Sequence, residues 1–126
     1  MPTRLYYNPE CSKSRTALDL LRSRGIEPER VDYRCNPPSV DELRDLVRLL
    51  GTPAAELVRM DEADAAGLAL RGPAVGMDDF LQALHAHPHL MQRPVFEHAG
   101  RAVIARPPER VLELLEGDGQ GARPLA

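Results

Sequence analysis

The first 35 residues contain the feature that most constrains the fold, a strand pattern followed by a helix pattern and a second strand pattern. Strand-type residues at 5–7 and 31–33 flank an apolar helical stripe at about 14–24, and Gly25 is a suitable helix stop. Two strands joined through a helix pair in parallel, with a right-handed crossover. The N-terminal region therefore predicts a βαβ unit.

The remainder of the chain predicts a helical insertion, then a hairpin and a last helix. The insertion covers about residues 37–90 and begins with the capping-box pair Ser39 and Glu42. Strand-type residues on either side of positions 98–101 predict a hairpin that turns at these positions. Its first strand is expected to begin at Pro94, where a cis bond is compatible with the topology. This order predicts an α/β fold: a thioredoxin-like four-stranded mixed sheet with an all-helical insertion between the βαβ and ββα units.

Length and composition predict a single soluble domain. The chain has 126 residues, and we expect one domain at 1–116, followed by a Gly-rich, flexible tail at 117–126. A net charge of −3 provides no general attraction for nucleic acid, and no apolar run is long enough for a membrane. We therefore expect a cytoplasmic monomer that binds neither nucleic acid nor membrane. Two cysteines without an export signal favour reduced, reactive thiols over a structural disulfide.

One of these cysteines, Cys11, lies where the first strand pattern gives way to the helix pattern. It follows the turn dipeptide Asn8-Pro9 and precedes Lys13 and Arg15. A thiol at a helix N-terminus is close to unpaired backbone N–H groups and to the positive end of the helix dipole, and both favour thiolate. The same N–H groups bind oxyanions. The loop is therefore a candidate site for a nucleophilic thiolate and an anion.

The second thiol that a dithiol mechanism needs is missing from this loop. Ser14 occupies the position that a second cysteine would take in a C-x-x-C motif. The other cysteine, Cys35, follows the second strand and is either an ordinary strand-end residue or a resolving thiol. A partner thiol must therefore come from Cys35 or from another molecule.

Three arginines lie at the ends of predicted elements and are candidate anion ligands. Arg93 and Arg106 each precede a proline, and Arg59 lies within the insertion. Guanidinium groups are planar, permanently charged forks that suit tetrahedral oxyanions, although most arginines are simply solvated surface groups. Three nearby histidines, His85, His87 and His89, do not predict a metal site, because Pro88 interrupts the helix that would align them.

Five short segments occur in a characteristic order: YNPECSKSR at 7–15, NPPS at 36–39, LVR at 57–59, QRPV at 92–95 and ARPPE at 105–109. Together they resemble the ArsC family, the glutathione- and glutaredoxin-coupled arsenate reductases. The resemblance extends over about residues 3–115. It implies a thioredoxin-like enzyme without a bound cofactor that uses glutathione as co-substrate and glutaredoxin as partner.

The resemblance also implies a role for each matching residue. Cys11 would attack arsenate to form a thiol–arsenate adduct, glutathione would displace and reduce the arsenic, and glutaredoxin would regenerate the thiol as arsenite leaves. The implied substrate-binding residues are Ser14, Arg15, Arg59, Arg93 and Arg106. Tyr7 is a departure from the family, which commonly carries at this position a histidine that helps to lower the cysteine pKa.

Two other functions remain open on the residues alone. The chain could be a glutathione-linked thiol reductase that acts on a mixed disulfide or another small substrate. It could also be a thioredoxin-like regulatory protein that binds a partner without catalysis. Regulators of that kind usually carry a C-x-x-C switch in this loop, and the serine at position 14 argues against it.

Overall fold

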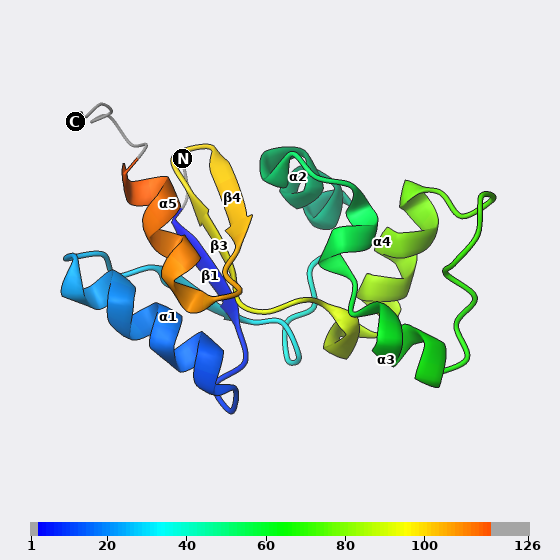
Figure 1. Cartoon of the computed structure of the whole chain (residues 1–126), viewed down its shortest axis with the longest axis horizontal. Helices are drawn as coiled ribbons and strands as arrows, with labels where there is room; N and C mark the ends of the chain where they lie inside the picture. Colours follow the sequence, from blue (N-terminus) through cyan, green and yellow to red (C-terminus); the bar gives the residue numbers. More distant parts are fainter. Residues whose placement is uncertain (1–2, 117–126) are drawn as a thin grey trace. The chain divides into compact units, whose positions relative to one another are not determined.

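The computed structural model describes residues 3–116, which form two compact units (Figure 1). A sheet unit contains the described residues 3–32 and 93–116, and a helical unit contains Tyr33–Gln92. The residues of the insertion expected at 37–90 lie in the helical unit. The flexible tail expected at 117–126 lies outside the described residues.

The sheet unit contains the predicted mixed sheet, with strand order β2-β1-β3-β4. Strand β1 pairs in parallel with β2 and antiparallel with β3, and β3 pairs antiparallel with β4. The prediction of four strands with both kinds of pairing is therefore confirmed. The strands are β1 Arg4–Tyr7, β2 Glu29–Asp32, β3 Val95–His98 and β4 Arg101–Ile104.

Two helices of the sheet unit, α1 (Ser12–Ser23) and α5 (Val111–Glu116), contribute to one hydrophobic core with the strands. Both lie on the same face of the sheet in Figure 1. A short 3-10 helix, η3 (Pro108–Arg110), leads into α5. The core is formed by the apolar residues that alternate along the strands and repeat along the helices. Its members include Leu5, Phe96 and Val103 from the strands, Ala17, Leu18 and Leu21 from α1, and Val111 and Leu114 from α5.

The hairpin between β3 and β4 turns at Ala99 and Gly100, as predicted. Both have positive φ, 55° and 80°, which is the geometry of a two-residue hairpin turn whose twist matches the strands. Strand β2 was predicted at 31–33 but begins at Glu29, because Glu29 pairs with Arg4 across the parallel ladder. That prediction placed the strand about two residues too late, since the exposed Glu29 and Arg30 do not show a strand-like apolar pattern.

The helical unit contains three α-helices and two 3-10 helices within the described part of the chain. The predicted capping box at Ser39 and Glu42 is present, and Gly51 ends the first helix with φ 69°. Buried leucines from its helices, such as Leu46, Leu57 and Leu84, form the interior. The elements are α2 Val40–Leu50, η1 Ala54–Leu57, α3 Met60–Ala65, α4 Met77–Ala86 and η2 Pro88–Leu90.

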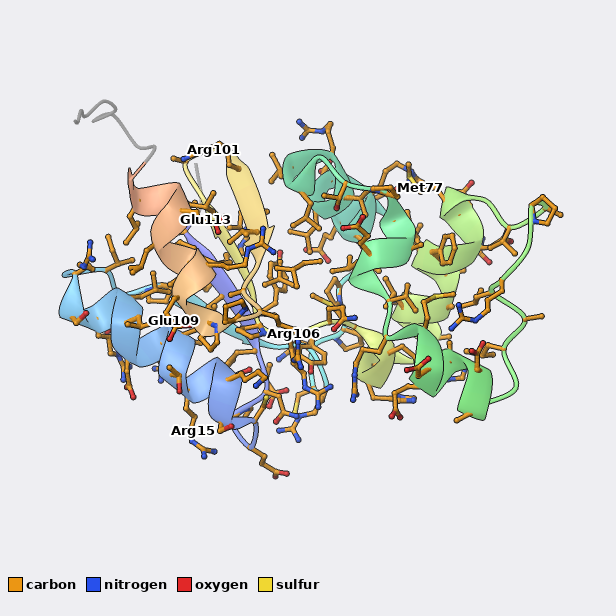
Figure 2. All side chains as sticks on the ribbon, in the orientation of Figure 1. Arg15, Met77, Arg101, Arg106, Glu109 and Glu113 are labelled. Carbon is orange, nitrogen blue, oxygen red and sulfur yellow. The ribbon has the colours of Figure 1, made fainter. Side chains whose placement is uncertain are left out.

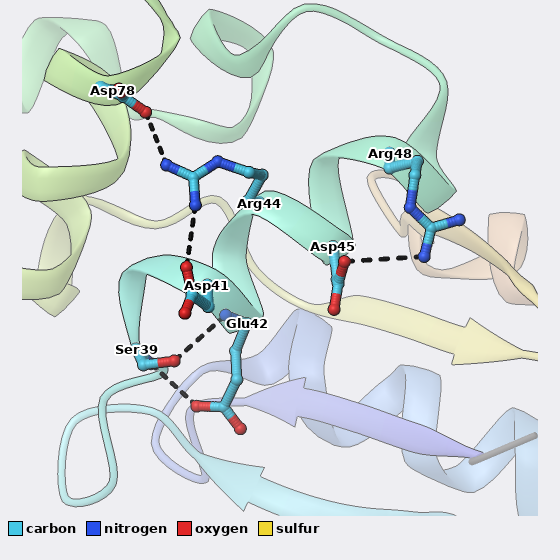
Figure 3. Close-up of polar contacts among 7 residues, drawn as sticks. All are labelled: Ser39, Asp41, Glu42, Arg44, Asp45, Arg48 and Asp78. Atoms are coloured by element: carbon cyan, nitrogen blue, oxygen red, sulfur yellow. Dashed lines mark hydrogen bonds and ion pairs between the residues drawn. The ribbon is translucent and has the colours of Figure 1, made fainter.

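Figure 3 shows the polar contacts around α2. Arg44 donates to Asp41 on its own helix at 2.9 Å and to Asp78 on α4 at 2.7 Å, so it ties two helices of this unit together. Arg48 and Asp45 form a second pair along α2 at 3.6 Å. None of the helices in residues 3–116 is long and apolar enough to cross a membrane.

Candidate active site

The loop between β1 and α1 is organised by Asn8, which makes hydrogen bonds through three of its groups. Its carbonyl accepts from the Cys11 N–H at 2.9 Å, and its Oδ1 accepts from the Glu10 N–H at 2.9 Å. Its own N–H donates to the Ser14 Oγ at 3.2 Å. Asparagine is suited to this position because its short amide side chain can hydrogen-bond to the backbone two residues ahead. The loop is therefore fixed on both sides of Pro9.

Helix α1 begins directly after Cys11, which is the residue at the N-cap position. The backbone of Cys11 is extended, with φ −94° and ψ 125°, and its carbonyl accepts from the Arg15 N–H at 3.1 Å. The helix was expected from about Ser14, so it starts two residues earlier than predicted. As a result the partly buried thiol lies at the N-terminus itself.

The pKa of Cys11 is lowered to about 7. Partial burial by itself raises the pKa. The backbone N–H groups of Ser14 and Lys13 and the side chains of Arg93 and Ser14 favour the thiolate, and together they lower the pKa by more than burial raises it. At neutral pH a large fraction of the sulfur is therefore in the nucleophilic form. Sequence reasoning predicted this activation from the helix N-terminus, and the structure adds Arg93 as a direct contributor.

Arg93 and Arg106 lie together in the sheet unit. Arg106 Nη1 donates to the carbonyl oxygen of Arg93 at 2.9 Å, and the two X-Pro bonds, Arg93–Pro94 and Arg106–Pro107, are both cis. The first of these was anticipated and the second was not. The guanidinium of Arg93 also interacts with Cys11. Its Nε is buried and has no hydrogen-bond partner among the described residues. A buried donor without an acceptor is costly, so this group favours an acceptor brought by a ligand.

Arg15 and Ser14 differ in accessibility. The exposed Arg15 donates from Nη1 to the Pro9 carbonyl at 3.0 Å, and Figure 2 labels it at the start of α1. The side chain of Ser14 is fully buried. Arg106, also labelled in Figure 2, lies just after β4 and is exposed. Both arginines keep further guanidinium N–H groups for a ligand.

Arg59 belongs to the helical unit, where its backbone and side chain are both held. Its N–H donates to the Leu90 carbonyl at 2.7 Å, Nη1 donates to the His89 carbonyl at 3.3 Å, and Nη2 lies 3.8 Å from Glu62 Oε2. An isolated bridge between Val58 and Met91 joins the same two segments. Arg59 lines an open pocket of about 240 Å³ together with Met60, Asp61, Glu62 and Gln92.

The predicted site residues are therefore divided between the two units. Five of them belong to the sheet unit, namely Cys11, Ser14, Arg15, Arg93 and Arg106, whereas Arg59 belongs to the helical unit. Sequence reasoning treated Asn8 only as part of a turn and missed its role as the hydrogen-bonding centre of the loop. The signal was present, because Asn-Pro before a helix start is typical of a turn built on an asparagine side chain.

Other residues considered at the sequence level have local contacts. Tyr7 packs against the hydrophobic core of the sheet unit, and Cys35 is an exposed cysteine in the helical unit. His85 Nδ1 hydrogen-bonds to the Pro38 carbonyl at 2.9 Å, and the His87 and His89 rings meet edge-on at 6.1 Å. Residues 3–116 contain no group of three or more His, Cys, Asp or Glu side chains that could hold a metal ion.

The fold and this site define a thioredoxin-like α/β protein with an ionisable cysteine on its first βα turn. The ArsC family model matches residues 6–114. An arsenate reductase from Vibrio cholerae, whose structure has been solved, superimposes with a TM-score of 0.84 at 38% identity, covering 90% of this chain and 97% of that one. The chain belongs to the ArsC family.

Two relatives are similar to this chain over most of its length. The uncharacterised protein YfgD of Escherichia coli K12 is 42% identical over 113 residues, covering 89% of this chain and 95% of that protein. An arsenate reductase of Neisseria meningitidis serogroup A is 38% identical over 113 residues, covering 89% of this chain and 97% of that protein. The similarity therefore includes both the sheet unit and the helical unit.

Proposed function

We propose that this protein is an arsenate reductase that takes its electrons from glutathione and glutaredoxin. The Cys11 thiolate attacks arsenate and forms a sulfur–arsenic bond, and one arsenate oxygen leaves as water. Glutathione then displaces and reduces the arsenic, and arsenite leaves. Two electrons pass to arsenic, and two thiols are oxidised to one disulfide, which glutaredoxin helps to return to thiols.

The observation that carries this proposal is the pairing of an activated sulfur with an arginine whose buried Nε has no acceptor among the described residues. Arg93 contributes to lowering the Cys11 pKa, and its buried Nε has no partner among the described residues. An oxyanion that reacts at the sulfur would bring oxygen atoms to such a donor. Donors placed in advance where charge develops stabilise the adduct as it forms.

The substrate-binding set that we propose extends to the other family positions. Arg106 is held against the backbone of Arg93, so it can share the charge of the same oxyanion. Arg15 is exposed at the start of α1 and adds positive charge to the loop. Arg59 is included because the chain belongs to a family in which this position holds the oxyanion.

We propose an external thiol as reductant. Ser14 replaces the second cysteine of a C-x-x-C motif, and its side chain is fully buried. We further propose that the protein acts as a monomer in the cytoplasm, where reduced glutathione would supply that thiol. Neither nucleic acid nor a membrane has a part in this reaction.

The test is reduction of arsenate by the full-length protein with glutathione, glutaredoxin and an NADPH-coupled readout. We expect turnover by the wild-type protein and by Cys35→Ser, and none above background by Cys11→Ser. Cys35→Ser is the matched control, because it removes the other thiol of the chain. Wild-type protein that turns over no faster than Cys11→Ser would contradict the proposal. Turnover of a glutathione mixed disulfide in place of arsenate would identify the thiol-reductase alternative.

A further inference from the structure

The open pocket of the helical unit has a size that suits a small head group. Its volume is about 240 Å³, whereas pockets that enclose whole drug-sized molecules measure about 300–1,000 Å³. Its lining consists of Arg59, Met60, Asp61, Glu62 and Gln92, all of which belong to the helical unit. A ligand of this pocket would therefore insert one end and leave the rest of its length outside.

Two backbone hydrogen bonds hold the walls of this pocket in place. The Arg59 N–H donates to the Leu90 carbonyl at 2.7 Å, and the Gln92 N–H donates to the Leu57 carbonyl at 2.8 Å. Leu57 and Leu90 are both fully buried, so the two lining residues are anchored directly on the interior of the unit. The pocket is therefore formed before a ligand arrives, which lowers the entropic cost of binding.

The pocket presents charges of both signs that are not hydrogen-bonded to each other. Arg59 Nη2 lies 3.8 Å from Glu62 Oε2, which is longer than a hydrogen bond, so both groups can still bond to a ligand. Asp61 is fully exposed at the rim and lies 3.5 Å from Arg71. The lining thus carries one positive and two negative side chains. A ligand with an anionic and a cationic group gains more here than a simple anion does.

We propose that this pocket binds the γ-glutamyl head group of glutathione, with the carboxylate of that group on Arg59 and its ammonium on Glu62. An α-amino acid carries both charges on one carbon, so they are adjacent, as the charges of this residue pair are. The cysteine and glycine of glutathione would lie outside the pocket, which leaves the thiol accessible. The inference rests on the proposed function, in which glutathione is the reductant. Arg59 has five N–H donors, so this contact is compatible with the oxyanion role proposed above.

The experiment is an NMR titration of the full-length protein with S-methylglutathione, whose thiol is blocked, in the absence of arsenate. We expect saturable shifts of the backbone amides of residues 59–62 and 92. Glu62→Gln should weaken binding about fivefold, the upper range for a partly exposed charge pair. Glu56→Gln is the matched control and should leave the affinity unchanged, because Glu56 is an exposed acid of the same unit outside the pocket lining. Thermal unfolding checks that each variant is folded.

A second probe, N-acetyl-S-methylglutathione, lacks the ammonium charge. Wild-type protein should prefer the probe with the free ammonium, and Glu62→Gln should lose this preference.

Three results would overturn the proposal. They are the absence of saturable shifts at these amides, equal losses of affinity in Glu62→Gln and Glu56→Gln, and equal binding of the two probes by wild-type protein. Inorganic phosphate that shifts the same amides at the same concentration would identify a general anion site instead, and would also overturn it. The titrations contain no arsenate, so a protein that reduces arsenate with glutathione but fails them keeps the proposed function and loses only this pocket assignment.

Discussion

The sheet unit and the helical unit use polar side chains in opposite ways. In the sheet unit, two backbone N–H groups, a buried serine and Arg93 all act on one sulfur, and the pKa of Cys11 falls to about 7. In the helical unit, Arg44 forms ion pairs with Asp41 and Asp78, and all three side chains are exposed to water. Water screens such pairs, so they contribute little. Donors in a partly buried loop therefore lower the pKa of a side chain, whereas exposed ion pairs have little energetic effect.

Arg44 and Arg93 differ in how fully their guanidinium groups are hydrogen-bonded. Arg44 donates to two carboxylates at 2.9 Å and 2.7 Å. Arg93 has a buried Nε without a partner among residues 3–116. A satisfied arginine has little to offer a ligand, whereas an unsatisfied one gains when an acceptor arrives. The number of salt bridges around a side chain is therefore a poor guide to its functional value.

The largest expected effect is on turnover when Arg93 is replaced. Arg93→Gln removes a charge that stabilises both the thiolate and the developing oxyanion. We expect kcat/KM for arsenate to fall by about 10²–10³, the usual cost of removing a group of this kind. Arg44→Gln removes the same charge from the helical unit and should leave kcat/KM unchanged. Equal losses of kcat/KM in the two variants would show that Arg93 contributes no more to turnover than an exposed arginine of the helical unit.

The next effect concerns the pH dependence of Cys11 modification. Because the pKa of Cys11 is lowered to about 7, its rate of alkylation should rise through a midpoint near that pH and fall away below it. The same protein unfolded in denaturant should show the value of a free thiol, about 8.5. The rate is measured with iodoacetamide in the Cys35→Ser background. A folded-state midpoint at the unfolded value would mean that the loop does not activate the sulfur.

A smaller effect is expected on stability when the cap of α2 is removed. Ser39 accepts from the Glu42 N–H at 3.1 Å, and Glu42 accepts from the Ser39 N–H at 2.8 Å. Ser39→Ala should lower the free energy of unfolding by about 1 kcal/mol in urea denaturation. The Cys11 thiolate midpoint should not move. A shifted midpoint would show that the helical unit also influences the ionisation of Cys11, contrary to the difference between the units described above.

The smallest effect is expected for Arg44→Ala. Because both of its ion pairs are exposed, its loss should decrease stability by much less than Ser39→Ala does. The difference should shrink further in high salt, where exposed charges are screened. Urea denaturation at low and high ionic strength measures both. A loss as large as that of Ser39→Ala, and insensitive to salt, would show that this exposed pair stabilises the unit strongly.

Part of the molecule could be predicted from the sequence because the decisive interactions are local. The capping box at Ser39, the left-handed stop at Gly51 and the hairpin turn at Gly100 depend on neighbours a few residues away. The position of Cys11 at a helix N-terminus was predicted for the same reason. The start of β2 at Glu29 was missed, because only its partner Arg4 across the ladder defines it.

The sequence by itself determined the order of the elements, the mixed sheet and the cysteine on the first turn, since these follow from periodicity, caps and turn residues. Only the tertiary structure decided which groups reach the sulfur. Arg93 is 82 positions away from Cys11 along the chain, and the pairing of β1 with β3 brings their segments together. Burial of Ser14 and the missing partner of Arg93 Nε depend on packing in three dimensions, which no local pattern specifies.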